Sequence, residues 1–487
     1  MVYFMDQFDT DNLLDDRALA EFISHGYTLI QTDQPPAFHQ DVCLQLDKIY
    51  AEEGNPGNNI LPRLPQVGQV FASAPVRGAL TSLLGAGYSM HPHRYCHLNR
   101  PGTEGQGWHK DDYVFDQNVR HHRFRWVMAF YYPQDVTPDM GATGIMPGRQ
   151  FHLSISSSDA AQSTEQELKL CGPAGTVALV NFDVWHRATA NTSANNRYML
   201  KFQFLRMAEP STPSWNNQAA SWPQVADDAH PGLSADVWNW MRGKPDSTAV
   251  EGTEADMVPL LAGRHDDDED RRLHAVYAFG AAGEQAIPAL LGALRKQACG
   301  LLEADLNGTP GSPQGSNPAE LSAAYALAAV GQAAVVPLVH ELRHADWRVR
   351  AAVADVLGNI GRGADVATTA LGHALDDDNV WVRRNAAEAL GTISHFDAET
   401  VARLTSCLED DDERVRRNAA LALAKLGPAA ATAEAGLIRR LADDGRYVRY
   451  NAVMALQRIG TPTALQAVWD DLLMARWCPI TDRSTPY

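Results

Sequence analysis

The sequence predicts two domains of different fold class: an N-terminal double-stranded β-helix of the jelly-roll or cupin-like type with flanking helices, then a C-terminal all-α solenoid. Two observations support this prediction. After about residue 90, short runs of alternating apolar and polar residues are separated by Gly, Pro and Asn, which is typical of an antiparallel β-domain. Between about residues 260 and 475, one amphipathic helical pattern recurs, and its four clearest copies are 33 residues apart, which indicates a repeat array.

In the N-terminal domain, placed at residues 1–208, helices are expected over residues 14–24 and 38–51, and over FISHGYTLI at residues 22–30. Residues 209–258 are rich in Pro, Ser, Trp and Asp, which predicts a linker with one short helix. The expected strands are RYCHLNR, FRWVMAFYY, ATGIMP, TVALVNF and RYMLKFQFL.

The array is placed at residues 259–475, with about six repeats, and residues 476–487 form a tail. Its four clearest units share a Val-Arg pair, at Val349/Arg350, Val382/Arg383, Val415/Arg416 and Val448/Arg449. Two weaker units precede these, and the pattern resembles the HEAT-like repeats of phycobilisome lyase proteins. We expect each repeated arginine to bridge neighbouring repeats. Such an array favours a protein partner or self-association.

Composition narrows the range of partners. The chain has 487 residues, 45% of them apolar, and a net charge of −18, which repels nucleic acid and anionic membranes. No apolar run is long enough to cross a membrane, and the acidic start lacks the pattern of a signal peptide. The six cysteines are scattered without a CxxC pair, so we expect reduced thiols and a cytoplasmic protein.

A His-x-Asp triplet is the strongest chemical signal in the N-terminal domain. On a strand, a histidine and a carboxylate at this spacing share one face, and they could supply two ligands of a non-haem Fe(II) site or form a surface pair. The triplet occurs five times, at His39/Asp41, His109/Asp111, His265/Asp267, His344/Asp346 and His395/Asp397. Only His109/Asp111 lies among predicted strands, and the other four are expected in a helix, an acidic run or turns.

A third ligand and an anion-binding residue are expected from the last strands of the same domain. His186 follows the strand TVALVNF, and Arg197 begins the strand RYMLKFQFL. A guanidinium near a metal suits a bidentate ion pair with the carboxylate of a cosubstrate. Residues proposed to line the substrate pocket are Tyr113, Trp126, Tyr131, Thr143 and Arg149.

Together these residues resemble the phytanoyl-CoA dioxygenase family of Fe(II)/2-oxoglutarate oxygenases. The metal motif of that family, His-x-Asp followed by a distal His, matches His109, Asp111 and His186, and its 2-oxoglutarate arginine matches Arg197. The stretch MGATGIMPGRQFH, residues 140–152, is similar to a further family segment. The resemblance implies Fe(II), 2-oxoglutarate and O2 as cofactor and cosubstrates, with release of succinate and CO2.

Three positions bear on the reaction. The family often has a small hydroxyl residue two positions after the distal histidine, where this chain has Ala188, and Arg149 stands where a small residue is common. Both differences concern substrate and cosubstrate binding. Halogenases related to the family have a small residue in place of the metal-binding carboxylate. Because this chain retains Asp111, the resemblance implies hydroxylation or a related oxidation.

Three functions follow as hypotheses. The leading one is a dioxygenase that oxidises a C–H bond of a small-molecule metabolite, with the repeats as an added scaffold. The second is a protein hydroxylase that recruits a polypeptide through the repeats. The third is a non-catalytic interaction scaffold, against which the complete set of His109, Asp111, His186 and Arg197 argues.

Overall fold

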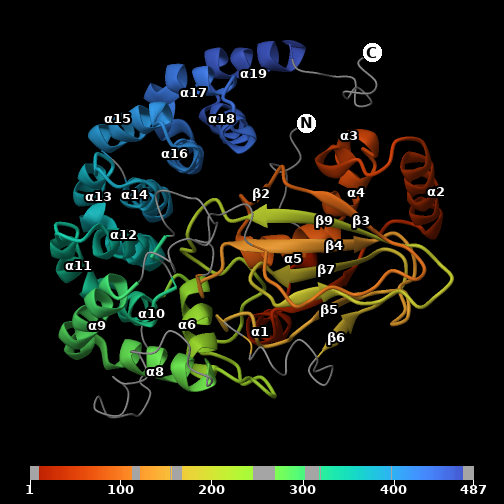
Figure 1. Cartoon of the computed structure of the whole chain (residues 1–487), viewed down its shortest axis with the longest axis horizontal. Helices are drawn as coiled ribbons and strands as arrows, with labels where there is room; N and C mark the ends of the chain where they lie inside the picture. The colour runs from red at the N-terminus through yellow and green to blue at the C-terminus, as the bar shows by residue number, and fades with distance from the viewer. Residues whose placement is uncertain are drawn as a thin grey trace. The chain divides into compact units, whose positions relative to one another are not determined.

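A computed structural model of the chain forms two compact units (Figure 1). The first comprises residues up to 111 and residues 124–244, and the second comprises residues 121–123 and 269–474. The described residues are 10–111, 121–153, 155, 167–244, 269–301, 317–318, 320–395 and 397–474. The predicted fold class is confirmed in both units.

The first unit is built on two antiparallel sheets. The larger has the order β1-β7-β4-β9-β2, with β3 also paired to β9, and the smaller has the order β6-β5-β8. The strands are β1 (Tyr27–Gln31), β2 (Ser89–Met90), β3 (Tyr95–Asn99), β4 (Trp126–Tyr132), β5 (Thr143–Ile145), β6 (Leu168–Leu170), β7 (Thr176–Asn181), β8 (His186–Ala188) and β9 (Arg197–Leu205). All five predicted strands are present. Every residue of β7 and β9 is buried, as expected for strands covered on both faces.

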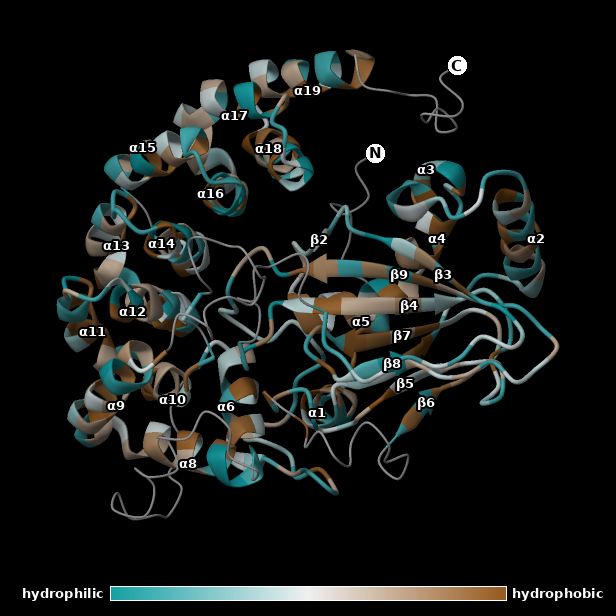
Figure 2. Ribbon diagram, in the orientation of Figure 1, coloured by the Kyte–Doolittle hydropathy of each residue, from teal (hydrophilic) through white to brown (hydrophobic). Residues whose placement is uncertain are grey.

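Helices cover one face of the larger sheet. Phe71 packs against Phe202 and Phe204 of β9, with ring centroids 4.4 and 5.4 Å away. His39 hydrogen bonds through Nδ1 to the hydroxyl of Tyr131 on β4 at 2.7 Å. These contacts leave the opposite face of the sheet for the interior of the sandwich; Figure 2 shows the apolar colouring of β7 within it. The covering helices are α2 (Pro36–Glu52), α3 (Ile60–Arg63), α4 (Val67–Ala72) and α5 (Ala74–Leu84).

The first helix ends earlier than the sequence analysis expects. Helix α1 (Asp16–His25) stops at Gly26, which adopts a φ of 79° and whose N–H donates to the carbonyl of Phe22. The next residues form strand β1, paired with β7. The expected helix over residues 22–30 is therefore wrong beyond Gly26, because a left-handed glycine ends the helix and the β-branched residues that follow pair with a sheet.

Residues 209–244 form part of the first unit. Asp16 of α1 accepts hydrogen bonds from the Trp215 indole, the Asn217 amide and two backbone N–H groups. Buried Glu209 accepts two from Arg125, at 2.6 and 3.0 Å, and one from Trp240 of α6 (Pro231–Met241). This part of the expected linker is thus an integral layer of the unit, and residues 245–258 lie outside the described residues.

The second unit contains six helix pairs in its described part. The first helices of successive pairs stack on one another and form the inner layer of an arc in Figure 1. The first helices are α8 (Glu269–Ala282), α10 (Ser322–Val330), α12 (Trp347–Ile360), α14 (Val380–Ile393), α16 (Glu413–Leu426) and α18 (Arg446–Ile459). Their partners are α9 (Ile287–Cys299), α11 (Val335–Glu341), α13 (Thr368–Ala374), α15 (Ala398–Ser406), α17 (Glu434–Arg440) and α19 (Pro462–Met474).

The constant spacing between repeats reflects helix caps and close packing of the helices. Asp346, Asn379 and Asp412, each 33 residues apart, accept a backbone N–H of the helix that they start. A Cβ added at Gly358 would lie 2.9 Å from the Cα of Ala389 in the next repeat. Small residues therefore allow adjacent inner helices to approach closely.

Three of the four repeated arginines bridge neighbouring repeats, as the sequence analysis expects, whereas the hydrogen bonds of Arg449 go to carbonyls of the turn before its own helix. Arg350 pairs with Asp377, Arg383 with Asp410, and Arg416 with Asp443, each through Nε and Nη2 at 2.7–3.1 Å. Each Nη1 also donates to two carbonyls of the turn before its own helix. This ladder links the turns that precede α12, α14, α16 and α18.

Two stretches of the array, Ser322–Glu341 and Glu413–Arg440, are long and apolar enough to cross a membrane by composition alone. Each contains the two helices of one repeat and passes through a glycine with positive φ, Gly331 and Gly427. Much of each apolar window is buried inside the array, as in the core helices of a helical repeat.

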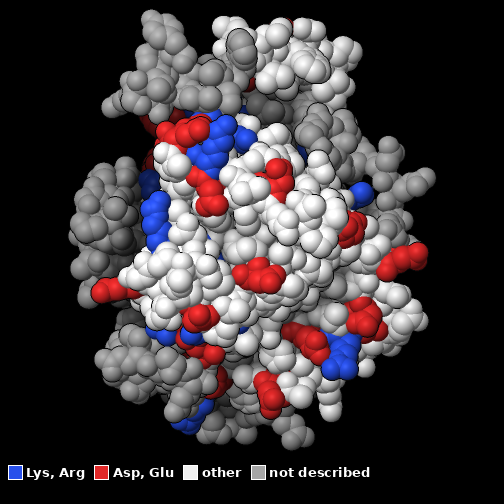
Figure 3. Space-filling model, turned by 90° about the vertical axis from the view of Figure 1, so that its right-hand side faces the viewer, with Lys and Arg blue, Asp and Glu red and all other residues white. Residues whose placement is uncertain are grey.

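On the face of the molecule in Figure 3, basic side chains lie next to acidic ones.

Replacing one arginine of the ladder should destabilise the array. Arg383→Ala removes a bidentate pair with Asp410 in which both side chains are mostly buried, and we expect a loss of about 2 kcal/mol in the free energy of unfolding. Urea unfolding followed by helical circular dichroism measures this change. Arg439→Ala is the control, because its pair with Glu409 is half exposed and should contribute less than about 0.5 kcal/mol. Equal effects of the two substitutions would contradict the ladder.

Candidate metal centre

Two backbone hydrogen bonds bring His109 and His186 side by side. The N–H of His109 donates to the carbonyl of His186 at 3.1 Å, and the N–H of His186 donates to the carbonyl of His109 at 3.0 Å. Residue 186 is also held by the smaller sheet, where it pairs with Ile145 of β5. The two imidazoles consequently lie with ring centroids 4.4 Å apart.

The hydrogen bonds of both imidazoles leave the same nitrogen available. Nδ1 of His109 contacts the carbonyl of Gly107 at 3.0 Å, and Nδ1 of His186 contacts the carbonyl of Val184 at 3.1 Å. A carbonyl only accepts, so each Nδ1 carries the proton and each Nε2 carries a lone pair. Burial also lowers the pKa of His186 to about 4, which keeps its ring neutral. Neutral imidazoles with a free Nε2 are competent metal ligands.

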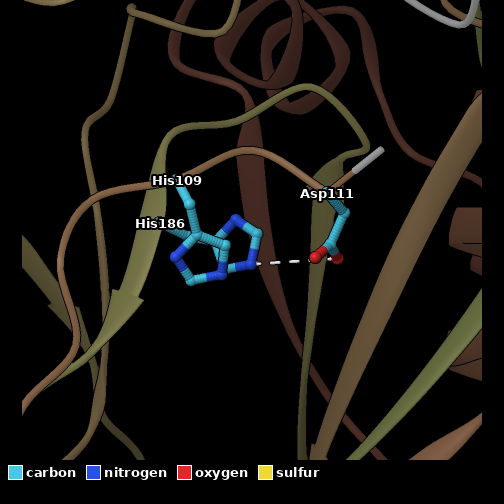
Figure 4. Close-up of side chains that lie close together, drawn as sticks. All are labelled: His109, Asp111 and His186. Atoms are coloured by element: carbon cyan, nitrogen blue, oxygen red, sulfur yellow. Dashed lines mark ion pairs between the residues drawn. The ribbon is translucent and has the colours of Figure 1, made fainter. Parts of the chain in front are cut away.

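Asp111 completes a group of three ligand atoms. Its Oδ2 lies 3.8 Å from Nε2 of His186, and the ligand atoms of His109, Asp111 and His186 all lie within 4.8 Å of one another (Figure 4). Burial opposes ionisation of Asp111, but Lys201 and His186 outweigh it and hold the pKa at about 2. Two histidines and one carboxylate on one side of a shared point fit a non-haem Fe(II) ion.

Lys201 is a residue of the site that the sequence analysis missed. Its Nζ donates to Oδ2 of Asp111 at 2.6 Å, and both side chains are buried. His97 on the neighbouring strand β3 is buried too, and its pKa falls to about 3 through burial and the charge of Lys201. A lysine four positions after Arg197 in a mostly apolar strand was the available signal, because residues at this spacing share one face.

Arg197 lies on the same face of β9 as Lys201 and is almost completely buried. Its Nε and Nη2 donate to the carbonyl of Gly141, with Nε at 3.0 Å. Gly141 has a φ of 71°, and a Cβ there would overlap the amide of Asn99. Nη1 of Arg197 has no hydrogen-bond partner among the described residues. A buried guanidinium with an unused N–H group is suited to an anionic ligand.

Alternation along the chain places Lys110 away from the metal ligands. Its Nζ pairs with Asp183 at 3.0 Å and donates to the carbonyl of Gln150 at 2.9 Å, next to the Trp185 ring. Lys110 and Asp111 therefore point to opposite sides, as expected for extended backbone.

Two of the residues proposed to line the substrate pocket, Trp126 and Tyr131, lie on opposite faces of β4. Trp126 shares a face of β4 with Phe130, whose ring centroid lies 6.3 Å from that of His186. Tyr131 does not join them, because it points to the helix-covered face and contacts His39. Arg149 contacts His152 at 3.3 Å, and Tyr113 lies outside the described residues.

Thr143 lies on β5 directly opposite Ala188 of β8, so their side chains are neighbours on one face. The hydroxyl of Tyr132 donates to Oγ1 of Thr143 at 3.2 Å. Tyr132 is buried near Arg197, whose charge opposes the rise in the Tyr132 pKa that burial causes. Two hydroxyls therefore lie beside the position where the resembling family often has one.

The other His-x-Asp triplets have structural roles where they are described. His39 is buried beside Tyr131, while Asp346 and Asp397 cap the starts of α12 and α15. His265/Asp267 lies outside the described residues.

Comparison with known proteins supports both resemblances. Residues 49–199 match the family model of phytanoyl-CoA dioxygenase (PhyH), and residues 317–391 and 368–435 match that of HEAT repeats. The predicted relationship to both families is thus confirmed for these parts of the chain. No curated protein matches the chain.

Solved structures similar to the chain include three proteins of low sequence identity. EctD from S. alaskensis, with 2-oxoglutarate and 5-hydroxyectoine, is 14% identical with a TM-score of 0.35, over 42% of this chain and 80% of that one. HygX from Streptomyces hygroscopicus, with nickel and 2-oxoglutarate, is 12% identical with a TM-score of 0.34, over 39% and 86%. The non-heme monooxygenase ThoJ–Ni complex is 12% identical with a TM-score of 0.32, over 45% and 94%.

Removing the Lys201 charge should lower the stability of the protein but raise the affinity of the site for a metal ion. In Lys201→Met, the protein without metal should lose about 3 kcal/mol in unfolding free energy, because one partner of a buried pair is gone. A divalent cation no longer competes with an ammonium for Oδ2 of Asp111, so Co(II) should bind roughly tenfold more tightly. Calorimetric titration and thermal unfolding measure the two effects.

Lys110→Met is the matched control for this substitution. It also removes a buried lysine from a carboxylate, but on the side away from the metal ligands. It should destabilise the protein without tightening Co(II) binding. Weaker Co(II) binding by Lys201→Met would show that the lysine orients Asp111 rather than competing with the metal.

Proposed function

We propose that the phytanoyl-CoA dioxygenase-type domain of this protein is an Fe(II)- and 2-oxoglutarate-dependent oxygenase. The observation that carries the proposal is the convergence of one nitrogen from each of two imidazoles and one carboxylate oxygen within 4.8 Å. Both imidazoles are held in the tautomer that a metal requires. The unused Nη1 of buried Arg197 supplies a matching site for an anionic cosubstrate.

Bound at this centre, Fe(II) and 2-oxoglutarate supply the oxidising chemistry, which consumes O2 and releases succinate and CO2. The chain's own residues hold and shield the reactants. His109, Asp111 and His186 would hold the metal through one side and leave its other positions open. The side chain of Phe130 lies against His186 and helps to exclude water.

The distal carboxylate of 2-oxoglutarate would be bound by Nη1 of Arg197 and by a nearby hydroxyl. Ala188 offers no hydroxyl, but Thr143 lies opposite it across the β5–β8 pair and carries one. Tyr132 donates its hydroxyl proton to Oγ1 of Thr143, which leaves the O–H of Thr143 to donate to the carboxylate beside Arg197. The hydroxyl missing from β8 is thus replaced by one on β5.

The substrate is proposed to be a small molecule that is hydroxylated at a C–H bond. Asp111 is present and ionised, so the carboxylate keeps its metal position and hydroxylation is favoured over halogenation. The three candidate ligand side chains are buried or half-buried, with Phe130 beside His186, and such a setting favours a small molecule over a folded polypeptide. A cytoplasmic location is proposed as well, because the five described cysteines are free.

The first test is an anaerobic titration with Fe(II) and then 2-oxoglutarate, in which a visible charge-transfer band reports the chelate. His186→Ala should show no band. Arg197→Ala should keep the band but require about tenfold more 2-oxoglutarate, because one charged hydrogen bond is lost.

His39→Ala serves as the control for losing a buried imidazole, since His39 lies on the helix-covered face of the sheet. It should retain the wild-type band. Absence of a band in wild-type protein with metal bound would refute the proposed cosubstrate site.

A separate titration tests the replacement hydroxyl. Thr143→Val keeps the side-chain shape and removes the hydroxyl, so the Kd for 2-oxoglutarate should rise about tenfold. Thr189→Val is the matched control, because the Thr189 hydroxyl donates to the carbonyl of Ala142 instead. If both variants bind 2-oxoglutarate like wild type, Thr143 does not contact it.

A further inference from the structure

One helix position in each repeat forms a stripe along the inner layer of the array. The first helix of each pair is followed directly by a glycine or a serine. These residues are Gly283, Gly331, Gly361, Ser394, Gly427 and Gly460, and the stripe position lies six residues before each of them. The residues at this position are Tyr277, Tyr325, Asp355, Glu388, Leu421 and Met454. The first four repeats therefore present polar groups at the stripe, and the last two present apolar ones.

The polar part of the stripe binds a short segment from the other half of the sequence. Residues 121–123 belong to the second unit, although they precede strand β4 of the first. His122 stacks on Tyr325, with ring centroids 4.1 Å apart and planes 16° apart, and its Nδ1 hydrogen bonds to the Tyr277 hydroxyl at 2.8 Å. Nε2 of His121 pairs with Oδ1 of Asp355 at 2.9 Å.

These contacts are buried and chemically specific. His122 is 4% exposed and Arg123 is 2% exposed, values usual for core residues rather than for a surface loop. Three successive inner helices, α8, α10 and α12, each contribute one side chain from the same position. Polar groups cost free energy to bury unless they are paired, so the pairing selects this segment over an arbitrary one.

We propose that the inner stripe of the HEAT array is an intramolecular peptide-binding site whose occupant is the segment His121–Arg123. The segment lies ten residues after the metal ligand Asp111 and three residues before β4 begins. Docking on the array holds the chain at one point between Asp111 and strand β4 of the oxygenase domain. A polypeptide partner that used the same three repeats would have to displace it, which argues against recruitment of a protein substrate there.

Limited trypsin digestion of the full chain tests this docking directly. Arg123 is a cleavage site that the docked segment keeps buried, and the product is recognised by a new N-terminus at Phe124. Cleavage follows the population of the undocked state when docking is fast. Asp355→Asn, Tyr277→Phe and Tyr325→Ala should each speed this cleavage about tenfold, the effect expected for losing one buried polar or aromatic contact.

Leu421→Ala is the matched control, because it truncates a side chain at the same helix position in a repeat beyond the contacts of the segment. It should leave the rate unchanged, and thermal unfolding checks that every variant is folded. Unchanged cleavage in Asp355→Asn and Tyr277→Phe would overturn the proposal, as would an equal increase in Leu421→Ala. The readout requires neither metal nor 2-oxoglutarate, so its outcome is independent of the proposed function.

Discussion

The metal centre depends on the pair of backbone hydrogen bonds between His109 and His186. These residues are 77 positions apart, and no regular strand contains His109. The bridge aligns the two backbones, and the carbonyls of Gly107 and Val184 then set the tautomer of each ring. Side chains alternate along extended backbone, and Lys110 pairs with Asp183 on the side away from the imidazoles. The side chain of Asp111 therefore points toward the imidazoles. One local pairing therefore determines three ligand positions and the direction in which they point.

This arrangement places several charges in an apolar sandwich. Asp111 and Lys201 pair with each other, while Arg197 depends on the carbonyl of Gly141 and keeps one N–H group unused. Buried pairs of this kind contribute little to stability compared with apolar packing. Their presence fits the proposed binding of a cation and an anionic cosubstrate. The strands around them, fully buried on β7 and β9, provide the stability that the centre itself does not.

The fold and the grouping of His109, Asp111 and His186 were predictable because their signals are local in the sequence. A 33-residue period, five alternating strands and a histidine–carboxylate spacing each need only a short window. Trp126 and Tyr131 could not both line the pocket, since an odd separation puts them on opposite faces of β4, and the structure retains Trp126 on the Phe130 face. Lys201 was missed because its partner Asp111 lies 90 residues away. The docked segment was missed because its contacts come from three different repeats.

The arginine ladder has a consequence for how this array can vary in length. Each rung connects one turn only to the next, so the stability of the array is close to a sum over adjacent repeats. Duplication or deletion of a unit near Leu421 or Met454 would create one equivalent junction and leave Tyr277, Tyr325 and Asp355 in register. Insertion among the first repeats would instead shift these three side chains apart by a whole unit. The array is thus modular at its C-terminal end and constrained in number where it binds residues 121–123.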